Sequence, residues 1–317
     1  MNNIVSTRVR FARNLSDCPF PANLGKDRKK LMLRIKDTAK KLYPDWDFID
    51  ATALTDIQAG AMIEQHLISP EFSERAEGSG LLLSKDRSVC IMINEEDHLR
   101  IQVFSNGDDI RKTYEKAREI EENLDKELHF AFSDKLGYLT QSPWNLGTAM
   151  RVSVLVHLPM LTSRNAVSYL TNAANQNGLT VRGIYGEGTE PMGALYQISN
   201  RITLGYSEDD IIDRITGMLE VILKSESDLA KGIAKDISAQ DRIYRAYGIL
   251  KQARLISSEE STKRLSDLRC GVEAGIIDMD PKTIDELVVR TQPCNIQLGN
   301  PENRDIARAE LIRQTLK

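Results

Sequence analysis

Two apolar stretches joined by a charged corner constrain the fold most. Val89–Ile93 is a continuous apolar run, which is typical of a buried central strand. From Leu99 to Val103 apolar and polar residues alternate, as they do in a half-buried strand. The polar residues 94–98 separate the two stretches. We therefore predict two sheet strands joined through a strongly charged corner.

Helical and extended patterns alternate through the first two thirds of the chain. Residues 26–43 have the apolar spacing of a helix, and we also predict helices over 147–161, opened by Thr148, and over 163–177, ended by Gly178. Strands are predicted over 179–184, 195–199 and 202–204, with a loop over 186–193. A capping box beginning at Ser207 predicts a further amphipathic helix.

The pattern changes near residue 230. Beyond it only helical segments are predicted, over 241–254, 259–274, 281–291 and 301–316, and Asp280-Pro281 and Asn300-Pro301 are start signals. We predict an α+β fold rich in antiparallel strands over residues 1–230, followed by an all-helical C-terminal module over 231–317.

Charge and apolar content narrow the classes of function. A net charge of -4 argues against general affinity for nucleic acid or anionic membranes. No apolar run approaches the ~20 residues of a spanning helix, and the N-terminus lacks the pattern of a signal peptide. The four cysteines are scattered without a C-x-x-C pair, so we expect reduced thiols and a cytoplasmic location, with no metal site built from them.

The charged corner contains three adjacent carboxylates, Glu95, Glu96 and Asp97. Such a cluster is commonly a solvated turn, but this one adjoins a strongly apolar strand. Arginines also stand in apolar or glycine-rich surroundings in several segments. Each alone is ordinarily a surface or ion-pair residue; together they would suit a polyphosphate. These are Arg8, Arg10, Arg100, Arg151 and Arg182. We expect Arg8 and Arg10 on one face of a strand and Arg151 in the first turn of a helix.

These arginines lie in four ordered segments, STRVR from Ser6, NEEDHLR from Asn94, NLGTAMR from Asn145 and RGIYGEGTE from Arg182. In this order they resemble the signature segments of phosphagen (ATP:guanido) kinases. Neither a Walker A motif nor the motif set of protein kinases is present. The resemblance implies an antiparallel-sheet phosphagen kinase catalytic domain flanked by helices over residues 1–230.

The resemblance also implies a nucleotide site. It assigns the five arginines to the phosphates of ATP and His66 to the adenine, although His66 alone would be read as a core or helix-end histidine. Mg²⁺ would be held by the phosphates and water rather than by protein ligands. The residues that the resemblance places along the nucleotide are Ser6, Thr7, Arg8, Val9, Arg10, His66, Arg100, Arg151, Val152, Ser153, Val154, Leu155, Arg182, Gly183, Ile184, Tyr185, Gly186 and Glu187.

Two carboxylates match the family's catalytic pair, Glu96 and Glu187. A guanidinium has a pKa above ~12 and is not nucleophilic while protonated. One carboxylate must orient it and take a proton as the N–P bond forms, and a second can bind the other edge of the planar group.

Two features indicate which guanidine is phosphorylated. The first arginine motif begins near the start of the sequence, so we expect no preceding helical domain and an open site suited to arginine in proteins. The C-terminal segment matches the RD-x-x-RA motif of bacterial protein-arginine kinases, which binds phosphoarginine as an allosteric ligand. Its residues here are Arg304, Asp305, Ile306, Ala307, Arg308 and Ala309.

One position departs from the family. Where relatives read C-P-T-N-L-G-T, this chain has Ser142 and Trp144. A serine hydroxyl cannot carry the negative charge of a thiolate, so we expect a slower or differently tuned enzyme. Two alternatives stay open, a kinase of a free guanidino metabolite and a phosphoarginine-binding adaptor with weakened catalysis.

The resemblance further implies protein partners. Relatives mark proteins for a Clp-type ATPase–protease, act on heat-shock repressors, respond to a zinc-binding activator protein and often form homodimers. We expect protein substrates with exposed arginines, and no nucleic acid or membrane partner.

Overall fold

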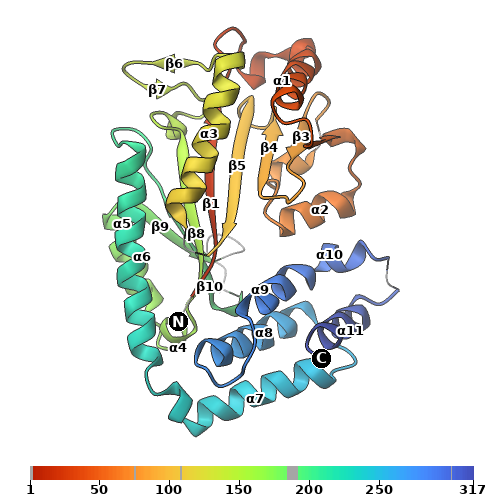
Figure 1. Cartoon of the computed structure of the whole chain (residues 1–317), viewed down its shortest axis with the longest axis vertical. Coiled ribbons are helices and arrows are strands. Elements are labelled where there is room, and N and C mark those ends of the chain that lie inside the picture. Colours follow the sequence, from red (N-terminus) through yellow and green to blue (C-terminus); the bar gives the residue numbers. More distant parts are fainter. Residues whose placement is uncertain (1–2, 75, 108, 184–191, 301) are drawn as a thin grey trace.

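The computed structural model describes residues 3–74, 76–107, 109–183, 192–300 and 302–317. An eight-stranded sheet forms its centre, with the strand order β2-β3-β4-β5-β1-β8-β10-β9 and antiparallel pairing between the neighbours (Figure 1). This confirms the predicted α+β fold. The strands are β1 Ile4–Arg13, β2 Asp47–Asp50, β3 Gly80–Leu83, β4 Val89–Ile93, β5 Leu99–Asn106, β8 Met150–His157, β9 Leu179–Gly183 and β10 Leu195–Asn200, and β6 Phe132–Ser133 and β7 Gly137–Tyr138 form a separate hairpin.

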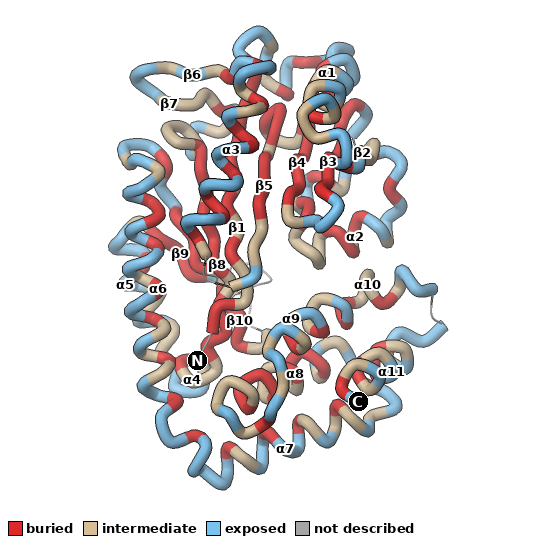
Figure 2. The backbone as a smooth tube through the Cα atoms, in the orientation of Figure 1, coloured by how far each residue is buried: buried red, intermediate tan, exposed pale blue. Residues whose placement is uncertain are grey.

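The helices of the first part of the chain pack mainly on one face of this sheet. Val9, Phe11, Val152 and Val154 are fully buried in one cluster with apolar side chains of α1, α3 and α6. Figure 2 shows the buried strands lying beneath the exposed outer faces of α3 and α6. The helices are α1 Arg28–Leu42, α2 Asp56–Glu64, α3 Ile110–Leu128, α4 Pro159–Ser163, α5 Val167–Gln176 and α6 Glu208–Ala230. Short 3-10 turns are Pro21–Asn23, Gly25–Asp27, Ala51–Ala53, Glu71–Glu74, Pro143–Asn145, Met192–Ala194 and Ile233–Lys235.

The strongest sequence patterns gave the right elements. The predicted strand pair is β4 and β5, in antiparallel register across the charged corner. The helix predicted over 26–43 is α1, which buries Leu31, Met32 and Ile35. Ser207 caps α6, because its hydroxyl accepts the N–H of Asp210 while the Asp210 carboxylate accepts the N–H of Ser207.

The helix predicted over 147–161 is wrong. Residues 150–157 form strand β8, and only Pro159–Ser163 is helical. Val152, Val154 and Val156 are buried at every second position, which is the period of a strand, and β-branched valines favour extended backbone. Gly147 and Thr148 imitate a helix start, but Gly147 forms an isolated β-bridge with Gly137 and Tyr138, and Thr148 lies in a bend before β8. The predicted strand over 202–204 is likewise absent, since residues 202 and 203 are irregular and a turn begins at Leu204.

The C-terminal helices build a module with its own core, which includes Ile243, Leu265, Leu287 and Ile312. They are α7 Ile237–Gln252, α8 Ser258–Glu273, α9 Pro281–Arg290, α10 Pro293–Gln297 and α11 Arg304–Thr315. Asp280 caps α9 as predicted. The short α10 was not predicted, and α11 begins after Asn303, whose side chain caps it, rather than at residue 301.

This module lies against the end of the sheet where β8 finishes and β1 begins (Figure 1). His157, the last residue of β8, hydrogen-bonds Ser266 of α8 at 2.8 Å. Glu64, the last residue of α2, accepts the backbone N–H groups of Cys294 and Asn295 at 2.8 and 2.9 Å. Within the described residues, no helix has the length and apolar content needed to cross a bilayer.

Candidate active site

The strand alternation creates a cationic sheet face opposite the helices. Arg8 and Arg10 lie on one side of β1, while the alternating residues Thr7 and Val9 are buried on the other. Arg10 is the cross-strand partner of Arg151 on β8, and Arg8 is the partner of Ser153. Arg151 is therefore a strand residue and not the helix N-terminal residue that the sequence predicted.

The five arginines selected from the sequence share one electrostatic environment. Burial, followed by the charges of Arg151 and Arg100, lowers the pKa of Arg8 to about 10. Burial, followed by Arg8, Arg151 and Arg100, lowers the pKa of Arg10 well below its ordinary value. The pKa of Arg151 is lowered by burial and then by Arg182 and Arg100. The chain thus gathers cations from β1, β5, β8 and β9 at one place.

Neutral side chains hold several of these cations. The Nε of Arg8 donates to Ser153 Oγ at 3.3 Å, and the Nη2 of Arg151 donates to Ser199 Oγ at 3.3 Å. Within the described ranges, neither these two arginines nor Arg10 forms an ion pair with a carboxylate. The buried Nε atoms of Arg10 and Arg151 have no hydrogen-bond partner there either. Partly buried cations without anions are costly, so this face suits an anionic ligand.

In the corner between β4 and β5, the carboxylates of Glu95 and Glu96 have different surroundings. The side chain of Glu95 is only 6% exposed and accepts hydrogen bonds from Arg100 Nη1 at 2.9 Å and from Ser69 Oγ at 2.5 Å. Glu96 is 38% exposed and accepts from Arg100 Nη2 at 3.1 Å. Glu96 lines a cavity of about 170 Å³ together with Arg10 and Arg151. Glu95 therefore anchors the corner, and Glu96 is the carboxylate that faces the cavity.

The third carboxylate of the corner is structural. Asp97 is buried and accepts hydrogen bonds from the side-chain amide of Asn14 at 2.6 Å and from the backbone N–H of Gln141 at 2.8 Å.

Burial raises the pKa of Glu96. The neighbouring carboxylates of Asp97 and Glu95 raise it further, and the positive charge of Arg100 opposes this rise. A raised pKa suits Glu96 to accept a proton near neutral pH.

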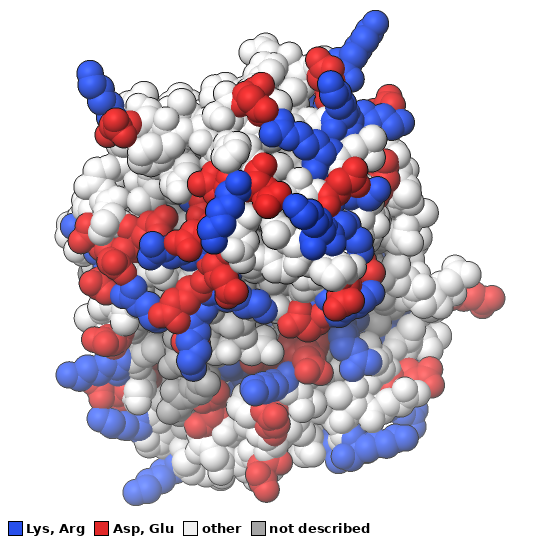
Figure 3. Space-filling model, turned by 45° about the horizontal axis from the view of Figure 1, so that its top comes forward, with Lys and Arg blue, Asp and Glu red and all other residues white. Residues whose placement is uncertain are grey.

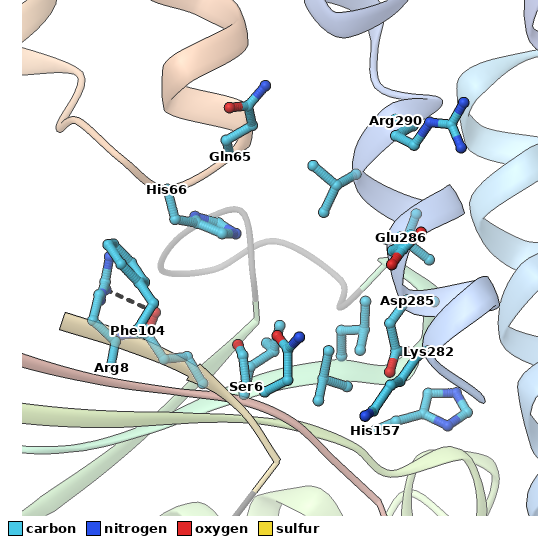
Figure 4. A pocket seen from close by; sticks show the side chains of 18 of the residues that line it. Ser6, Arg8, Gln65, His66, Phe104, His157, Lys282, Asp285, Glu286 and Arg290 are labelled. Carbon is cyan, nitrogen blue, oxygen red and sulfur yellow. Dashed lines mark hydrogen bonds between the residues drawn. The ribbon is translucent and has the colours of Figure 1, made fainter. Parts of the chain in front are cut away.

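A second, larger cavity of about 470 Å³ lies between the cationic face and the C-terminal module. Ser6 and Arg8 line it from β1, and His66 from the turn after α2. Asp285 and Arg290 of α9 stand on its far side (Figure 4).

His66 is held neutral in this cavity. Burial, together with the charges of Arg8 and Arg10, lowers the pKa of His66 to about 4. A neutral imidazole can pack against an adenine without adding charge.

In the stretches predicted to line the nucleotide, alternate residues lie on opposite faces of the sheet. Ser6, Ser153 and Leu155 line the larger cavity. The side chains of Thr7, Val9, Val152 and Val154 are instead fully buried, because alternate residues of a strand point to opposite faces. Gly183 ends β9, and residues Ile184, Tyr185, Gly186 and Glu187 lie outside the described residues.

Two polar residues of this face were missed in the sequence. Gln197 accepts a hydrogen bond from Arg8 Nη2 at 3.4 Å, and Ser199 accepts one from Arg151. Both stand on β10 two residues apart, so their spacing within a predicted strand indicates that they share a face, but not that this face belongs to the site.

The departure from the family motif also has a defined place. Ser142 precedes the turn Pro143–Asn145 and is half-buried. Trp144 in that turn lines the smaller cavity beside Glu96, yet is 86% exposed.

The C-terminal motif combines an exposed and a buried arginine. Arg304 is exposed at the start of α11. Arg308 is 2% exposed, forms an ion pair with Asp305 and donates to the backbone carbonyls of Thr291 at 2.7 Å and Ile256 at 2.9 Å.

The outer surface seen in Figure 3 carries interspersed acidic and basic side chains. The cluster of arginines is therefore a feature of the cavity and not of that outer face.

Comparisons with known proteins agree with this geometry. The family model "ATP:guanido phosphotransferase, C-terminal catalytic domain" matches residues 29–229, and "Protein-arginine kinase McsB C-terminal domain" matches residues 236–317. The chain is 43% identical to a protein-arginine kinase of Syntrophomonas wolfei, covering 99% of this chain and 91% of that protein. It is 41% identical to that of Halothermothrix orenii, covering 99% and 93%.

Solved structures show the same fold. A duplicated taurocyamine kinase from Schistosoma mansoni with bound transition-state-analogue components is 29% identical, with a TM-score of 0.63 over 71% of this chain and 33% of that one. Lombricine kinase is 22% identical, with a TM-score of 0.65 over 72% of this chain and 67% of that one, which supports the fold alone. The chain belongs to the ATP:guanido phosphotransferase family of phosphagen kinases, and its relatives over nearly the whole length are bacterial protein-arginine kinases.

Proposed function

We propose that this chain is a protein-arginine kinase that transfers the γ-phosphoryl group of ATP to the guanidino group of arginine side chains. The observation that carries the proposal is the placement of Glu96 in one cavity with Arg10 and Arg151. A carboxylate that can accept a proton thus stands beside cations that can bind phosphates. The names of the relatives support arginine in proteins as the acceptor.

The residues on this face account for the chemistry. Glu96 orients the acceptor guanidinium and accepts the proton that leaves its attacking nitrogen, as the N–P bond forms and the bond from the γ-phosphorus to the ADP oxygen breaks. The arginines neutralise charge on the transferring phosphoryl group, which is the dominant contribution in phosphoryl transfer. Glu187 is proposed as the second carboxylate on the guanidinium and lies outside the described residues.

ATP fits along the cationic face between the two cavities. We place its phosphates against Arg8, Arg10, Arg100, Arg151 and Arg182, because the buried Nε atoms of Arg10 and Arg151 need acceptors. The adenine would lie toward His66 in the larger cavity. Mg²⁺, held by the phosphate oxygens and water, would add further neutralisation of charge.

The C-terminal helices support a regulatory role. We propose that residues 231–317 form a module that binds phosphoarginine at Arg304, Asp305 and Arg308, attached to a catalytic domain over residues 1–230. The match of residues 236–317 to the McsB C-terminal domain supports this division. By the same resemblance we propose a cytoplasmic enzyme that forms homodimers, acts on a heat-shock repressor, responds to a zinc-binding activator protein and marks proteins for a Clp ATPase–protease.

One incubation tests the proposed acceptor. The protein is supplied with Mg-ATP and either free arginine or an unfolded protein, and phosphoarginine is sought by mass spectrometry under non-acidic conditions. Phosphoarginine in the protein supports the proposal. Modified free arginine alone would indicate a metabolite kinase, and absence of both products would indicate the adaptor. Glu96→Gln is the control and should abolish transfer.

A further inference from the structure

Three exposed apolar side chains stand on neighbouring segments at one side of the smaller cavity, which one of them lines. Leu136 follows β6, Trp144 stands in the turn Pro143–Asn145, and Leu204 follows β10. All three side chains are exposed although they are large and hydrophobic. We call Leu136, Trp144 and Leu204 the acceptor rim.

Backbone contacts hold the segments of the acceptor rim together. The N–H of Gly147 donates to the carbonyl of Leu136 at 2.8 Å. The hydroxyl of Thr203 lies 3.2 Å from the Trp144 carbonyl and donates to the Leu146 carbonyl at 2.7 Å. Gly147 has a φ of +97°, and a Cβ there would stand 2.3 Å from the Thr203 carbonyl oxygen. Only glycine permits this close approach, so the backbone that carries the three rim residues is held in one arrangement.

The acceptor rim meets the catalytic cavity at Trp144. Trp144 lines that cavity together with Glu96, and so does Thr203, the residue before Leu204. The remaining charged lining residues include Arg10, Arg100, Arg151 and Arg201, so cations outnumber the carboxylate. Past the guanidinium itself, the substrate must therefore extend over the apolar rim rather than deeper among the arginines.

Chemistry decides which substrate fits this rim. An exposed tryptophan offers a large apolar surface that becomes stabilising only when a partner covers it. A free amino acid carries an ammonium and a carboxylate close to its side chain and gains little from such a surface. A polypeptide replaces those charges with amides and supplies neighbouring side chains that can pack on the ring.

We propose that the acceptor rim is the docking surface for the polypeptide segment that carries the acceptor arginine, with Trp144 packing against apolar side chains next to that arginine. The proposal rests on the proposed function and narrows its substrates to arginines with apolar neighbours. Trp144 is then a residue that determines specificity, whereas Glu96 carries out the proton transfer.

Two peptides that differ only in the residues beside one arginine test the proposal, one with leucine and the other with serine. For the wild-type protein we expect the KM of the leucine peptide to be about tenfold lower. Trp144→Ala should remove this difference by raising the KM of the leucine peptide to that of the serine peptide, while the KM for ATP stays within about twofold. Trp144→Phe should keep most of the difference. Tyr169→Ala is the matched control, because Tyr169 is an exposed aromatic residue on α5 outside the cavity lining, and it should change nothing.

A binding measurement separates this proposal from the kinase activity. The chain has two tryptophans, and Trp46 is buried and stacked on Tyr43 at 4.2 Å, so Trp144 should dominate any change in emission on peptide binding. We expect a saturable change with the leucine peptide in the Glu96→Gln protein. Equal KM values for the two peptides, or a preference that survives Trp144→Ala, would overturn the docking surface. A saturable change in a wild-type protein that transfers no phosphate would support docking and overturn the kinase activity instead.

Discussion

Arg10 on β1 and Arg151 on β8 are directly opposed in adjacent antiparallel strands. Like charges at such positions destabilise a sheet, and the buried Nε atoms of both residues lack partners within the described residues. The fold therefore holds an unfavourable cation pair in place, and a polyphosphate would relieve it. This gives the cationic face a measurable thermodynamic signature.

Replacing one member of the pair should stabilise the protein without nucleotide and weaken its response to ATP. For Arg10→Gln we expect the free energy of unfolding without ligand to rise by about 0.5 kcal/mol, because the repulsion is removed. At saturating ATP the gain in stability should fall by about 1.4 kcal/mol for each tenfold loss of affinity. Denaturant unfolding with and without Mg-ATP measures both effects.

The matched control is Arg34→Gln, since Arg34 is a partly exposed arginine paired with Asp17 at 2.8 Å. It should leave the response to ATP unchanged. An Arg10→Gln protein that is stabilised by ATP as strongly as the wild type would contradict the phosphate-binding role.

Glu96 should set the acidic limb of the pH–rate profile. Burial and neighbouring carboxylates raise the pKa of Glu96 above its ordinary value of 4.5. The base must be ionised to accept a proton, so kcat/KM should fall as the pH drops through this raised pKa. Glu71→Gln removes one of the charges that raise the pKa, so it should move the limb to lower pH without abolishing activity. A limb that stays in place would argue against Glu96 as the base.

Restoring the cysteine of the family motif should accelerate the enzyme. A thiolate at position 142 can place negative charge beside the guanidinium, and one charge-assisted contact is worth roughly ten- to a hundredfold in rate. We expect Ser142→Cys to raise kcat by about tenfold, whereas Ser142→Ala should leave it nearly unchanged. Turnover that is unchanged or lower in the cysteine protein would show that this position does not limit the rate.

The two arginines of the C-terminal motif should respond differently to substitution. Arg308 is buried against the carbonyls of Thr291 and Ile256, so Arg308→Ala leaves acceptors unsatisfied and should lower the free energy of unfolding by about 1–3 kcal/mol. Arg304 is exposed, so Arg304→Ala should leave stability unchanged and weaken binding of a phosphoarginine peptide. Calorimetric unfolding and titration with that peptide measure the two effects, and unaltered binding in Arg304→Ala would count against the allosteric pocket.

Elements with a single consistent pattern were predictable from the sequence. The continuous apolar run of β4 and the alternation in β5 defined the charged corner, and the capping box at Ser207 located α6. The sequence predicts a helix where β8 stands, because Gly147 and Thr148 imitate a helix start and outweigh the alternation of the valines in β8. The predicted start of α11 at residue 301 is wrong because Asn300-Pro301 resembles a helix cap, whereas the side chain of Asn303 makes the capping contacts.

The sequence selected candidate site residues but not their arrangement. The ordered motifs singled out the arginines and Glu96, and register decides which neighbours share their face. Gln197 and Ser199 reach the site only because β10 pairs with β8, and pairing between distant strands leaves no local trace in a sequence. The contact of Glu64 with Asn295 joins segments separated by 231 positions and was equally hidden.

Phosphorus-31 NMR of one reaction tests the central claim most directly. The wild-type protein and Glu96→Gln are each mixed with Mg-ATP and an unfolded, arginine-containing protein at neutral pH. Our account predicts a new N–P resonance in the wild-type reaction, equal in amount to the ADP formed and retained with the protein after gel filtration, and none with Glu96→Gln. Release of ADP without that resonance, or an equal resonance with Glu96→Gln, would contradict it.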